Sequence, residues 1–404
     1  MYWNDILAMR ASPTPSPEFL FAAACCVWPL NDNRLRAIRK AAEGPLDWER
    51  FVRIVSRHRV EGLVNNAMTR AEIATPTSVS SEIHESASGN LRHNLEMAAE
   101  AAKLMRSFAD AEIEVLFLKG LTLAHLAFGN LGLRHSKDID LLIAPENIEA
   151  ASALLEDAGY RRCEPDPRIG NAQIRSLRSL RKDLGYFHEA SGFEVELHWR
   201  LFDNPHMLGG ISVASAQRAV PIAAGMSLPT LGDDDLFAYL CAHGANDGWF
   251  RLKWLADIGA LLANASGSEV ARLYGAAKQK GAGPAAAQAL LLCRRLFNTE
   301  LPESLSRRLQ SSVRARWLER IGLWAMRTGD EVTALPEVSF GGTRIFFSHF
   351  LFGRGWRYAM REIRIFLTNT DDMLMVPLPA QLTFLYPLLR LPLWAVGRFT
   401  GRAH

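Results

Sequence analysis

The stretch of sequence that decides the fold is LFLKGLTLAHLAFGNLGLRHSKDIDLLI, residues 116–143. Two short apolar runs mark its ends, VLFL at 115–118 and IDLLI at 139–143, and turn residues bound each run. Helical segments flank both runs, and this alternation is typical of a mixed α/β unit. The sequence therefore predicts two strands that are joined by a helix and a loop.

Two aspartates, Asp138 and Asp140, lie at the start of the second run. Because side chains alternate along a strand, both carboxylates project to one face while Ile139 and Leu141 point into the sheet. A divalent cation relieves the repulsion between two such anions, and hard oxygen ligands favour Mg²⁺ or Mn²⁺. The pair is therefore predicted to hold metal.

A third carboxylate comes from DLGYFHEASGFEVELHW (183–199), which predicts a hairpin with a glycine-containing turn around 189–192. In its second arm, Glu194, Glu196 and His198 share one face. We expect Glu196 to be the ligand and Glu194 its solvated neighbour, although they exchange roles if the register differs by one pleat. His198 is expected to be structural rather than a general base.

Three carboxylates on neighbouring strands could hold two metal ions, which activate an attacking hydroxyl and stabilise a leaving pyrophosphate. Donors for phosphate are expected nearby. Gly120 precedes the helical LTLAHLAF and would let phosphate approach backbone amides at a helix start, while Lys119 adds a point charge. Arg134 and Ser136 supply further donors in the loop before the aspartates. The predicted chemistry is phosphoryl or nucleotidyl transfer.

The rest of the chain is largely helical. LDWERFVRIVSRHRVEGLVNNAM and HNLEMAAEAAKLMRSFADA repeat apolar residues three and four apart, and the chain turns helical again from 233. Pro145 and Gly159 are expected to bracket another helix after the aspartates. We therefore predict four units, which are an N-terminal helical unit (1–111), a catalytic core (112–230), a helical domain that completes the nucleotide site (231–327), and a linker with a basic, aromatic helical segment (328–404).

Composition bounds the class of protein. The 404 residues carry 46 basic and 43 acidic side chains, so the net charge of +3 creates no global field for nucleic acid and any basic surface must be local. The 5 cysteines lack metal-ligand spacing and suit a reduced compartment. The start of the chain lacks the pattern of a secretory signal. A cytoplasmic location is expected.

The C-terminal region 341–404 mixes aromatic residues with arginines, which outnumber Glu362, Asp371 and Asp372. One interpretation is an amphipathic element that contacts an anionic membrane surface or nucleic acid. The other is a helical cap whose aromatic residues fill the core while arginines snorkel outward. The cap is favoured because prolines prevent one long amphipathic helix. The longest apolar stretch, 382–396, is shorter than the roughly 20 residues of a spanning helix.

The order LFLKGLTLAHLAF, LRHSKDIDLLI, a helix to AGY, and VELHW resembles the uncharacterised nucleotidyltransferase family of bacteria, within the polymerase-beta-like nucleotidyltransferase superfamily. LDWERFVRIVSRHRV, HGANDGWFRLKWLADIGALL and LPAQLTFLYPLLRLP extend the resemblance over nearly the whole chain. It implies an α/β (α+β) fold with a small mixed sheet, and metal-ligand roles for Asp138, Asp140 and Glu196. The wider superfamily usually has Gly-Gly or Gly-Ser where this chain has Lys119-Gly120, so the phosphate cradle can differ.

Lys253 and Asp257 are one helical turn apart in WFRLKWLAD and are expected to share a helix face with Trp249. One interpretation is an intrahelical salt bridge. The other, which the resemblance supports, is that Lys253 reaches a triphosphate, Asp257 orients Lys253, and Trp249 or His243 borders the nucleotide.

The sequence thus predicts an enzyme that moves a nucleoside monophosphate from a nucleoside triphosphate to an acceptor hydroxyl or amine and releases pyrophosphate. The acceptor stays open among a small molecule, a protein side chain and an RNA end, although the near-neutral charge disfavours RNA. Two alternatives are an inactive nucleotide-binding module and a membrane-peripheral accessory protein that uses 341–404.

Overall fold

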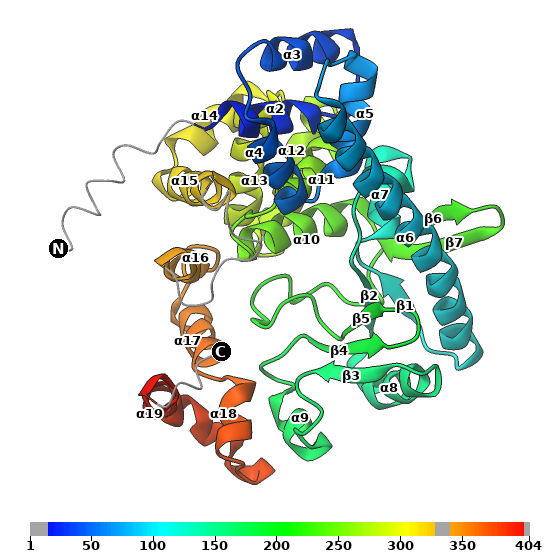
Figure 1. The fold of residues 1–404 in the computed structure, drawn as a ribbon. Coiled ribbons are helices and arrows are strands. Elements are labelled where there is room, and N and C mark those ends of the chain that lie inside the picture. Colours follow the sequence, from blue (N-terminus) through cyan, green and yellow to red (C-terminus); the bar gives the residue numbers. More distant parts are fainter. Residues whose placement is uncertain (1–14, 328–339, 400–404) are drawn as a thin grey trace.

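The computed structural model describes residues 15–327 and 340–399 (Figure 1). The helices are α2 (Pro17–Cys25), α3 (Asp32–Ala42), α4 (Trp48–His58), α5 (Glu61–Ala71), α6 (Thr77–Asp110), α7 (Leu121–Phe128), α8 (Ile148–Asp157), α9 (Asn171–Leu177), α10 (Asp233–Asn246), α11 (Leu252–Leu261), α12 (Gly267–Gln279), α13 (Gly283–Phe297), α14 (Glu303–Ser311), α15 (Val313–Arg327), α16 (Phe340–His349), α17 (Trp356–Phe366), α18 (Thr370–Met375) and α19 (Tyr386–Phe399). The strands are β1 (Val115–Phe117), β2 (Asp138–Ile143), β3 (Arg161–Glu164), β4 (Asp183–His188), β5 (Phe193–His198), β6 (Gln217–Ala223) and β7 (Met226–Leu231).

A mixed five-stranded sheet in the order β1-β2-β5-β4-β3 forms the centre of the predicted catalytic core. Strands β2 and β5 are parallel neighbours, and their register sets Asp138 opposite Glu194 and Asp140 opposite Glu196. The expected strands at 115–118 and 139–143 are confirmed, as is the hairpin of β4 and β5. The mixed α/β prediction is therefore correct, and the register brings acidic residues from distant parts of the chain to one place.

One face of this sheet is buried against α6 and α8 (Figure 1). Ile139, Leu141 and Val195 belong to this core, and each is at most 3% exposed. Because Ile139 lies between two aspartates, burying its side chain directs the carboxylates away from the core. The alternation predicted for β2 is confirmed.

A second hydrophobic core joins the N-terminal helices to α10–α15, which lie side by side in the upper part of Figure 1. The backbone N–H of Leu252 donates to His58 Nδ1 at 2.9 Å, and Arg57 donates to the carbonyl oxygens of Ala325 and Met326 at 3.0 and 3.2 Å. The segments 1–111 and 231–327 thus share one packed core in their described parts. The boundaries of the four units stay a prediction.

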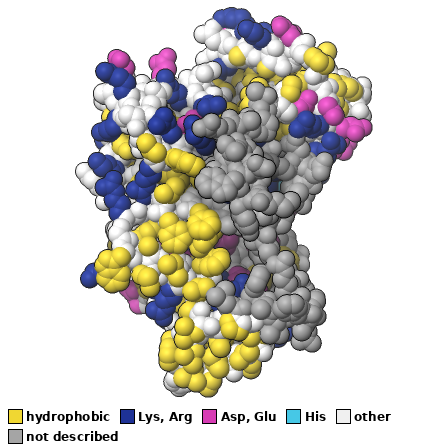
Figure 2. Space-filling model, turned by 90° about the vertical axis from the view of Figure 1, so that its left-hand side faces the viewer, with side chains coloured by type: hydrophobic (Ala, Val, Ile, Leu, Met, Phe, Trp, Pro, Cys, Tyr) yellow, Lys and Arg dark blue, Asp and Glu magenta, His cyan; other side chains and the backbone are white. Residues whose placement is uncertain are grey.

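The C-terminal helices α16–α19 form an arm beside α9 (Figure 1), and Gln173 of α9 donates to the Leu378 carbonyl oxygen at 3.0 Å. The expected cap is confirmed for Tyr358, which is buried. It is wrong for Trp356 and Phe366, which are 72% and 55% exposed. Figure 2 turns the left-hand side of Figure 1 toward the viewer and shows hydrophobic side chains gathered in its lower half, where the arm lies. Within the described residues, no helix is long and apolar enough to cross a membrane.

The hairpin of β6 and β7 was not predicted. Its turn contains Gly225, which has a φ of +74° and so occupies the left-handed region that favours glycine. Strand β7 packs beside β1 and extends the structure past the edge of the five-stranded sheet (Figure 1). In sequence, this hairpin lies between the last strand of the five-stranded sheet and α10, which begins two residues after β7 ends.

Candidate active site

Lys119 lies between the two aspartates of β2. Its Nζ is 3.3 Å from Asp138 Oδ1 and 2.5 Å from Asp140 Oδ2. The position of Lys119 follows from the sheet, because the backbone N–H of Leu118 donates to the Asp140 carbonyl oxygen at 3.0 Å. The ammonium group therefore acts as the counter-ion of both carboxylates.

Strand β5 adds Glu196 and His198 to this cluster. His198 Nε2 lies 3.3 Å from Asp140 Oδ1 and 3.2 Å from Glu196 Oε2. One ligand atom from each of Asp140, Glu196 and His198 lies within 4.8 Å of the others, which is close enough for one metal ion to be held. The structure thus brings the three predicted carboxylates to neighbouring positions and adds the imidazole as a fourth potential ligand.

The carboxylates fit a divalent ion because they combine hard oxygen donors with access from the cavity. The side chains of Asp138 and Glu196 are 22% and 38% exposed, whereas that of Asp140 is fully buried. Glu194 is not directed to the cluster, since its carboxylate pairs with Lys137 at 2.5 Å. This arrangement supports the interpretation of Glu194 as a solvated neighbour.

The cluster shifts the pKa values of its own members. Burial acts to lower the pKa of Lys119, but the charges of Asp138 and Asp140 outweigh it and raise this pKa well above its ordinary value. Burial acts to raise the pKa of Asp138, and the Lys119 ammonium outweighs it, so this pKa is lowered. Burial raises the pKa of Asp140. Lys119 is therefore charged, and Asp138 is ionised, at neutral pH.

Carboxylates face both ring nitrogens of His198 and hold the imidazole in place. Burial acts to lower its pKa, but its hydrogen bonds with Asp140 and Glu196 outweigh this effect and raise the pKa. Its Nδ1 is 3.7 Å from Asp183 Oδ2, and Asp183 pairs in turn with Lys182. His198 therefore links the carboxylates of two strands, and whether its role is structural or that of a metal ligand stays a prediction.

The loop after β1 and the loop before β2 meet beside the cluster. Gly120 has a φ of +71°, so a side chain at this position would be strained. Ser136 is 3% exposed, yet its Oγ has no hydrogen-bond partner within residues 15–327 and 340–399. A buried hydroxyl without a partner is costly unless a ligand or water completes it. The loop therefore offers an unused donor next to the aspartates.

Arg134 and Asp257 form a buried ion pair, with Nε 2.9 Å from Oδ1 and side chains that are 3% and 2% exposed. The intrahelical salt bridge between Lys253 and Asp257, one of the two interpretations from the sequence, is replaced by a pair of Asp257 with Arg134 from the loop before β2. Lys253 Nζ donates instead to the His135 carbonyl oxygen at 3.1 Å. Burial, followed by the charges of Arg134 and Arg59, lowers the pKa of Lys253 well below its ordinary value.

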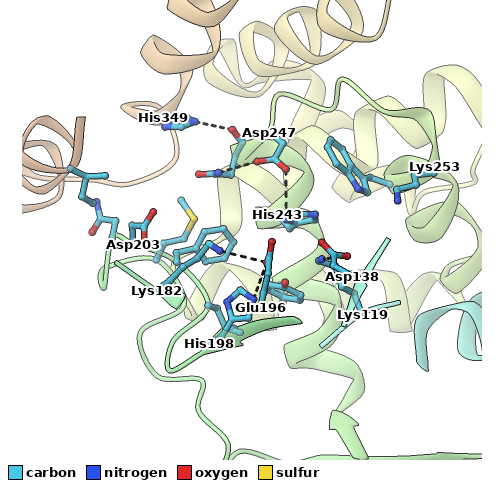
Figure 3. Close-up of a pocket in the computed structure, with 18 of the residues that line it drawn as sticks. Lys119, Asp138, Lys182, Glu196, His198, Asp203, His243, Asp247, Lys253 and His349 are labelled. Atoms are coloured by element: carbon cyan, nitrogen blue, oxygen red, sulfur yellow. Dashed lines mark hydrogen bonds and ion pairs between the residues drawn. The ribbon is translucent and has the colours of Figure 1, made fainter. Parts of the chain in front are cut away.

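These residues line a cavity of about 340 Å³. Figure 3 shows Asp138, Glu196 and Lys119 grouped at one side of this space, with His243 beside them and Lys253 beyond Asp138. A volume of this order suits part of a small ligand. Of the predicted residues, Lys119, Arg134, Ser136, Asp138, Glu196 and Lys253 line the cavity, while Asp140 and Asp257 lie behind it.

Aromatic rings of α10 and α11 form another wall of the cavity. Tyr239 and His243 stack with ring centroids 6.0 Å apart, and Trp254 meets His243 edge-on at 5.2 Å. The expectation that Trp249 shares a helix face with Lys253 is wrong, because α11 begins only at Leu252. Trp249 is buried where Gly244 leaves room for its indole. Trp254 supplies the indole of the cavity wall.

A model of an uncharacterised nucleotidyltransferase family matches residues 44–298. The chain belongs to this family. The matched range includes every site residue predicted from the sequence, from Lys119 to Asp257. The chain matches no curated protein and no solved structure.

The cavity receives further residues from outside the matched range. His349 of α16 and Glu362 of α17 line the cavity, and their side chains lie 3.6 Å apart (Nδ1 to Oε2). Asn204 joins this wall by donating to Glu362 Oε1 at 2.7 Å. Figure 3 shows His349 on the side of the cavity across from Lys253. The C-terminal arm is therefore part of the cavity.

Several lining residues were missed from the sequence. Tyr239 could have been found, because it lies four residues before His243 and therefore on the same helix face. Lys182, which lies 4.0 Å from Glu196 Oε2, could have been found from its position beside the predicted hairpin. His349 and Glu362 carry no such local signal, since only the tertiary fold brings them to the cavity.

Proposed function

We propose that this chain is a metal-dependent nucleotidyltransferase that moves a nucleoside monophosphate from a nucleoside triphosphate to an acceptor hydroxyl or amine. The observation that supports this most strongly is the meeting of Asp138, Asp140 and Glu196 beside Lys119, with Asp138 and Glu196 lining one cavity and Asp140 directly behind its wall. We propose further that the five-stranded sheet is the core of a polymerase-beta-like nucleotidyltransferase fold, and that the protein is bacterial. The acceptor stays open among a small molecule, a protein side chain and an RNA end.

Asp138, Asp140 and Glu196 would hold Mg²⁺ or Mn²⁺, with His198 as an additional candidate ligand. When bound, these ions would help to deprotonate the acceptor and neutralise charge on the departing pyrophosphate. The chain's own contribution is orientation. Strand register sets Asp140 opposite Glu196, and the hydrogen bonds of His198 keep both carboxylates in place.

The triphosphate would bind beside the aspartates. Ser136 Oγ is an available donor, Gly120 opens the start of α7, and Lys253 lines the same cavity. Arg134 is held by Asp257, so its role would be to keep the loop in position and add positive potential. The rings of Tyr239, His243 and Trp254 provide an apolar wall for the nucleoside.

The experiment is a measurement of pyrophosphate release and label transfer from each of the four α-labelled nucleoside triphosphates. Wild-type protein and the Asp138→Ala/Asp140→Ala variant are compared in lysate fractions with Mg²⁺ or Mn²⁺. We expect metal-dependent labelling by the wild type alone, and the labelled product identifies the class of acceptor. Nucleotide binding without any labelling would instead favour the inactive module.

A folding control is needed because the variant removes charges that pair with Lys119. Circular dichroism and a thermal melt of the same preparations provide it. A variant that is folded and retains wild-type labelling would contradict the assignment of the two aspartates.

A further inference from the structure

A second hollow lies behind the C-terminal wall of the catalytic cavity. It has a volume of about 780 Å³ and runs between α12–α15 and the start of α17. A neighbouring hollow of about 550 Å³ shares Tyr274, Lys278 and Arg308 with it. Because the two hollows share these lining residues, they form one extended depression, which we name the basic groove.

The basic groove is lined by cations and by no acidic side chain among the described residues. The cations are Lys278, Arg308, Arg314, Arg354 and Arg357. Arg314 donates to the Gly353 carbonyl oxygen at 2.7 Å, which holds the loop before α17. Lys278 and Arg354 are exposed. Like charges that converge without counter-ions repel one another, so an anionic ligand would stabilise them.

Aromatic rings alternate with these cations. The Arg308 guanidinium lies 5.1 Å from the centroid of the Tyr274 ring, and that of Arg357 lies 5.7 Å from a ring centroid of Trp356. Trp356 is 72% exposed, so most of its indole is open to a ligand. Positive charge that follows a groove, together with exposed aromatic faces, is the combination that binds single-stranded nucleic acid.

The shape of the groove favours a single-stranded nucleic acid over a free phosphate or a membrane surface. A free phosphate would need only a few of the cations, whereas the two hollows extend well beyond one anion. A bilayer surface cannot follow a concave groove between helices, but a flexible strand can. Figure 2 also shows blue Lys and Arg side chains outnumbering magenta Asp and Glu side chains on the left-hand flank of that face.

We propose that the basic groove binds the phosphate backbone of single-stranded nucleic acid, with a base stacked on Trp356. The interaction is local, which is compatible with a net charge of only +3. It does not depend on the proposed transfer activity.

The groove and the catalytic cavity share a wall. Tyr358 lines the groove, and Glu362, one helical turn later, lines the cavity. Asn204 donates to the Tyr358 carbonyl oxygen at 3.3 Å and to Glu362 at 2.7 Å. A bound strand would therefore lie directly behind residues of the candidate active site.

The test is fluorescence anisotropy of a labelled oligouridine of about 12 nucleotides with the full chain. The variants are Lys278→Gln, Arg354→Gln and Trp356→Ala. Lys278→Gln and Arg354→Gln each remove one phosphate contact, which is expected to weaken binding about fivefold at 0.1 M salt. The slope of the logarithm of the binding constant against the logarithm of the salt concentration should become less steep by about 0.7. Trp356→Ala is expected to weaken binding at least about fivefold.

Lys40→Gln is the matched control, because Lys40, like Lys278, is an exposed lysine in the last turn of a helix. It lies outside the groove and should bind as the wild type does. Equal affinity of the wild type and the groove variants would overturn the proposal. So would capture of tripolyphosphate, or of phosphatidylserine vesicles, without measurable binding of the oligonucleotide.

Asp138→Ala is measured in the same assay without nucleoside triphosphate and is expected to bind the strand normally. Failure of the groove proposal is thereby distinguished from failure of the proposed function. Thermal melts confirm that each variant is folded.

Discussion

Asp257→Asn tests the buried ion pair that holds the loop before β2 against α11. The pair joins Arg134 Nε to Asp257 Oδ1 at 2.9 Å across 123 residues of sequence. Burial acts to raise the pKa of Asp257, and the charge of Arg134 opposes this effect. Replacing the carboxylate by an amide would leave the Arg134 guanidinium buried without its counter-charge.

Removing one partner of such a pair typically costs about 3–5 kcal/mol, because the remaining charge stays desolvated. The lower end of this range is expected here, since asparagine keeps an oxygen that can accept the hydrogen bond from Arg134. A loss of about 3 kcal/mol reduces the ratio of folded to unfolded protein more than 100-fold. The double variant Arg134→Met/Asp257→Leu should recover much of this loss, because neither charge is then buried.

The assay is urea denaturation followed by circular dichroism, with linear extrapolation of the free energy of unfolding. Asp233→Asn is the matched control, since Asp233 pairs with Arg218 at 2.8 Å and both side chains are more than half exposed. The control should lose less than about 1 kcal/mol. If Asp257→Asn loses no more than Asp233→Asn, the buried pair does not stabilise the loop as argued.

Three further predictions concern pH, proton uptake and packing. The pKa of His349 is raised above 6.5 because its hydrogen bond with Glu362 outweighs burial, and the pKa of Glu362 is lowered below 4.5 because hydrogen bonds from His349 outweigh burial. This pair therefore stabilises the folded chain most between pH 4.5 and 6.5. The difference in free energy of unfolding between the wild type and Glu362→Gln should shrink when the pH is raised above this range or lowered below it. A difference that does not depend on pH would refute this prediction. Burial lowers the pKa of Lys253, so binding of a triphosphate should be accompanied by uptake of a proton at this side chain. Calorimetry in two buffers with different ionisation enthalpies should then give different heats of binding for the wild type. The two heats should be equal for Lys253→Met. Gly244→Ala would place Cβ 2.5 Å from the indole of Trp249 and should reduce the free energy of unfolding by about 1–3 kcal/mol in urea, whereas an unchanged midpoint would show that the helix shifts freely.

Local periodicity was sufficient to predict β1, β2, β4 and β5 and the acidic side of the sheet, but not β3, β6 or β7. Ile139 is buried and its neighbours Asp138 and Asp140 both reach Lys119, as alternation along a strand requires. The hairpin of β4 and β5 followed from its glycine-containing turn, and Gly192 has a φ of +71° in that turn. These features depend on residues close in sequence, so the sequence alone contained the signal.

Contacts between distant segments could not be predicted in the same way. The spacing of Lys253 and Asp257 indicated a pair on one helix. In the folded chain Asp257 instead forms a buried ion pair with Arg134, which lies 123 residues earlier in the sequence. His349 and Glu362 reach the cavity only because the C-terminal arm folds beside the sheet. Whether an aromatic side chain of that arm is buried, as Tyr358 is, or exposed, as Trp356 is, depends on the same packing.

The measurement that tests the central claim most directly compares labels on two phosphorus atoms of one nucleoside triphosphate. Wild-type chain is incubated with Mn²⁺, a lysate fraction and either α-labelled or γ-labelled nucleotide. Nucleotidyl transfer predicts a labelled acceptor from the α-label only, and release of the γ-label in pyrophosphate, with both results lost in Asp140→Asn. Labelling of the acceptor from the γ-phosphate would contradict the account, because Asp138, Asp140 and Glu196 would then serve phosphoryl transfer.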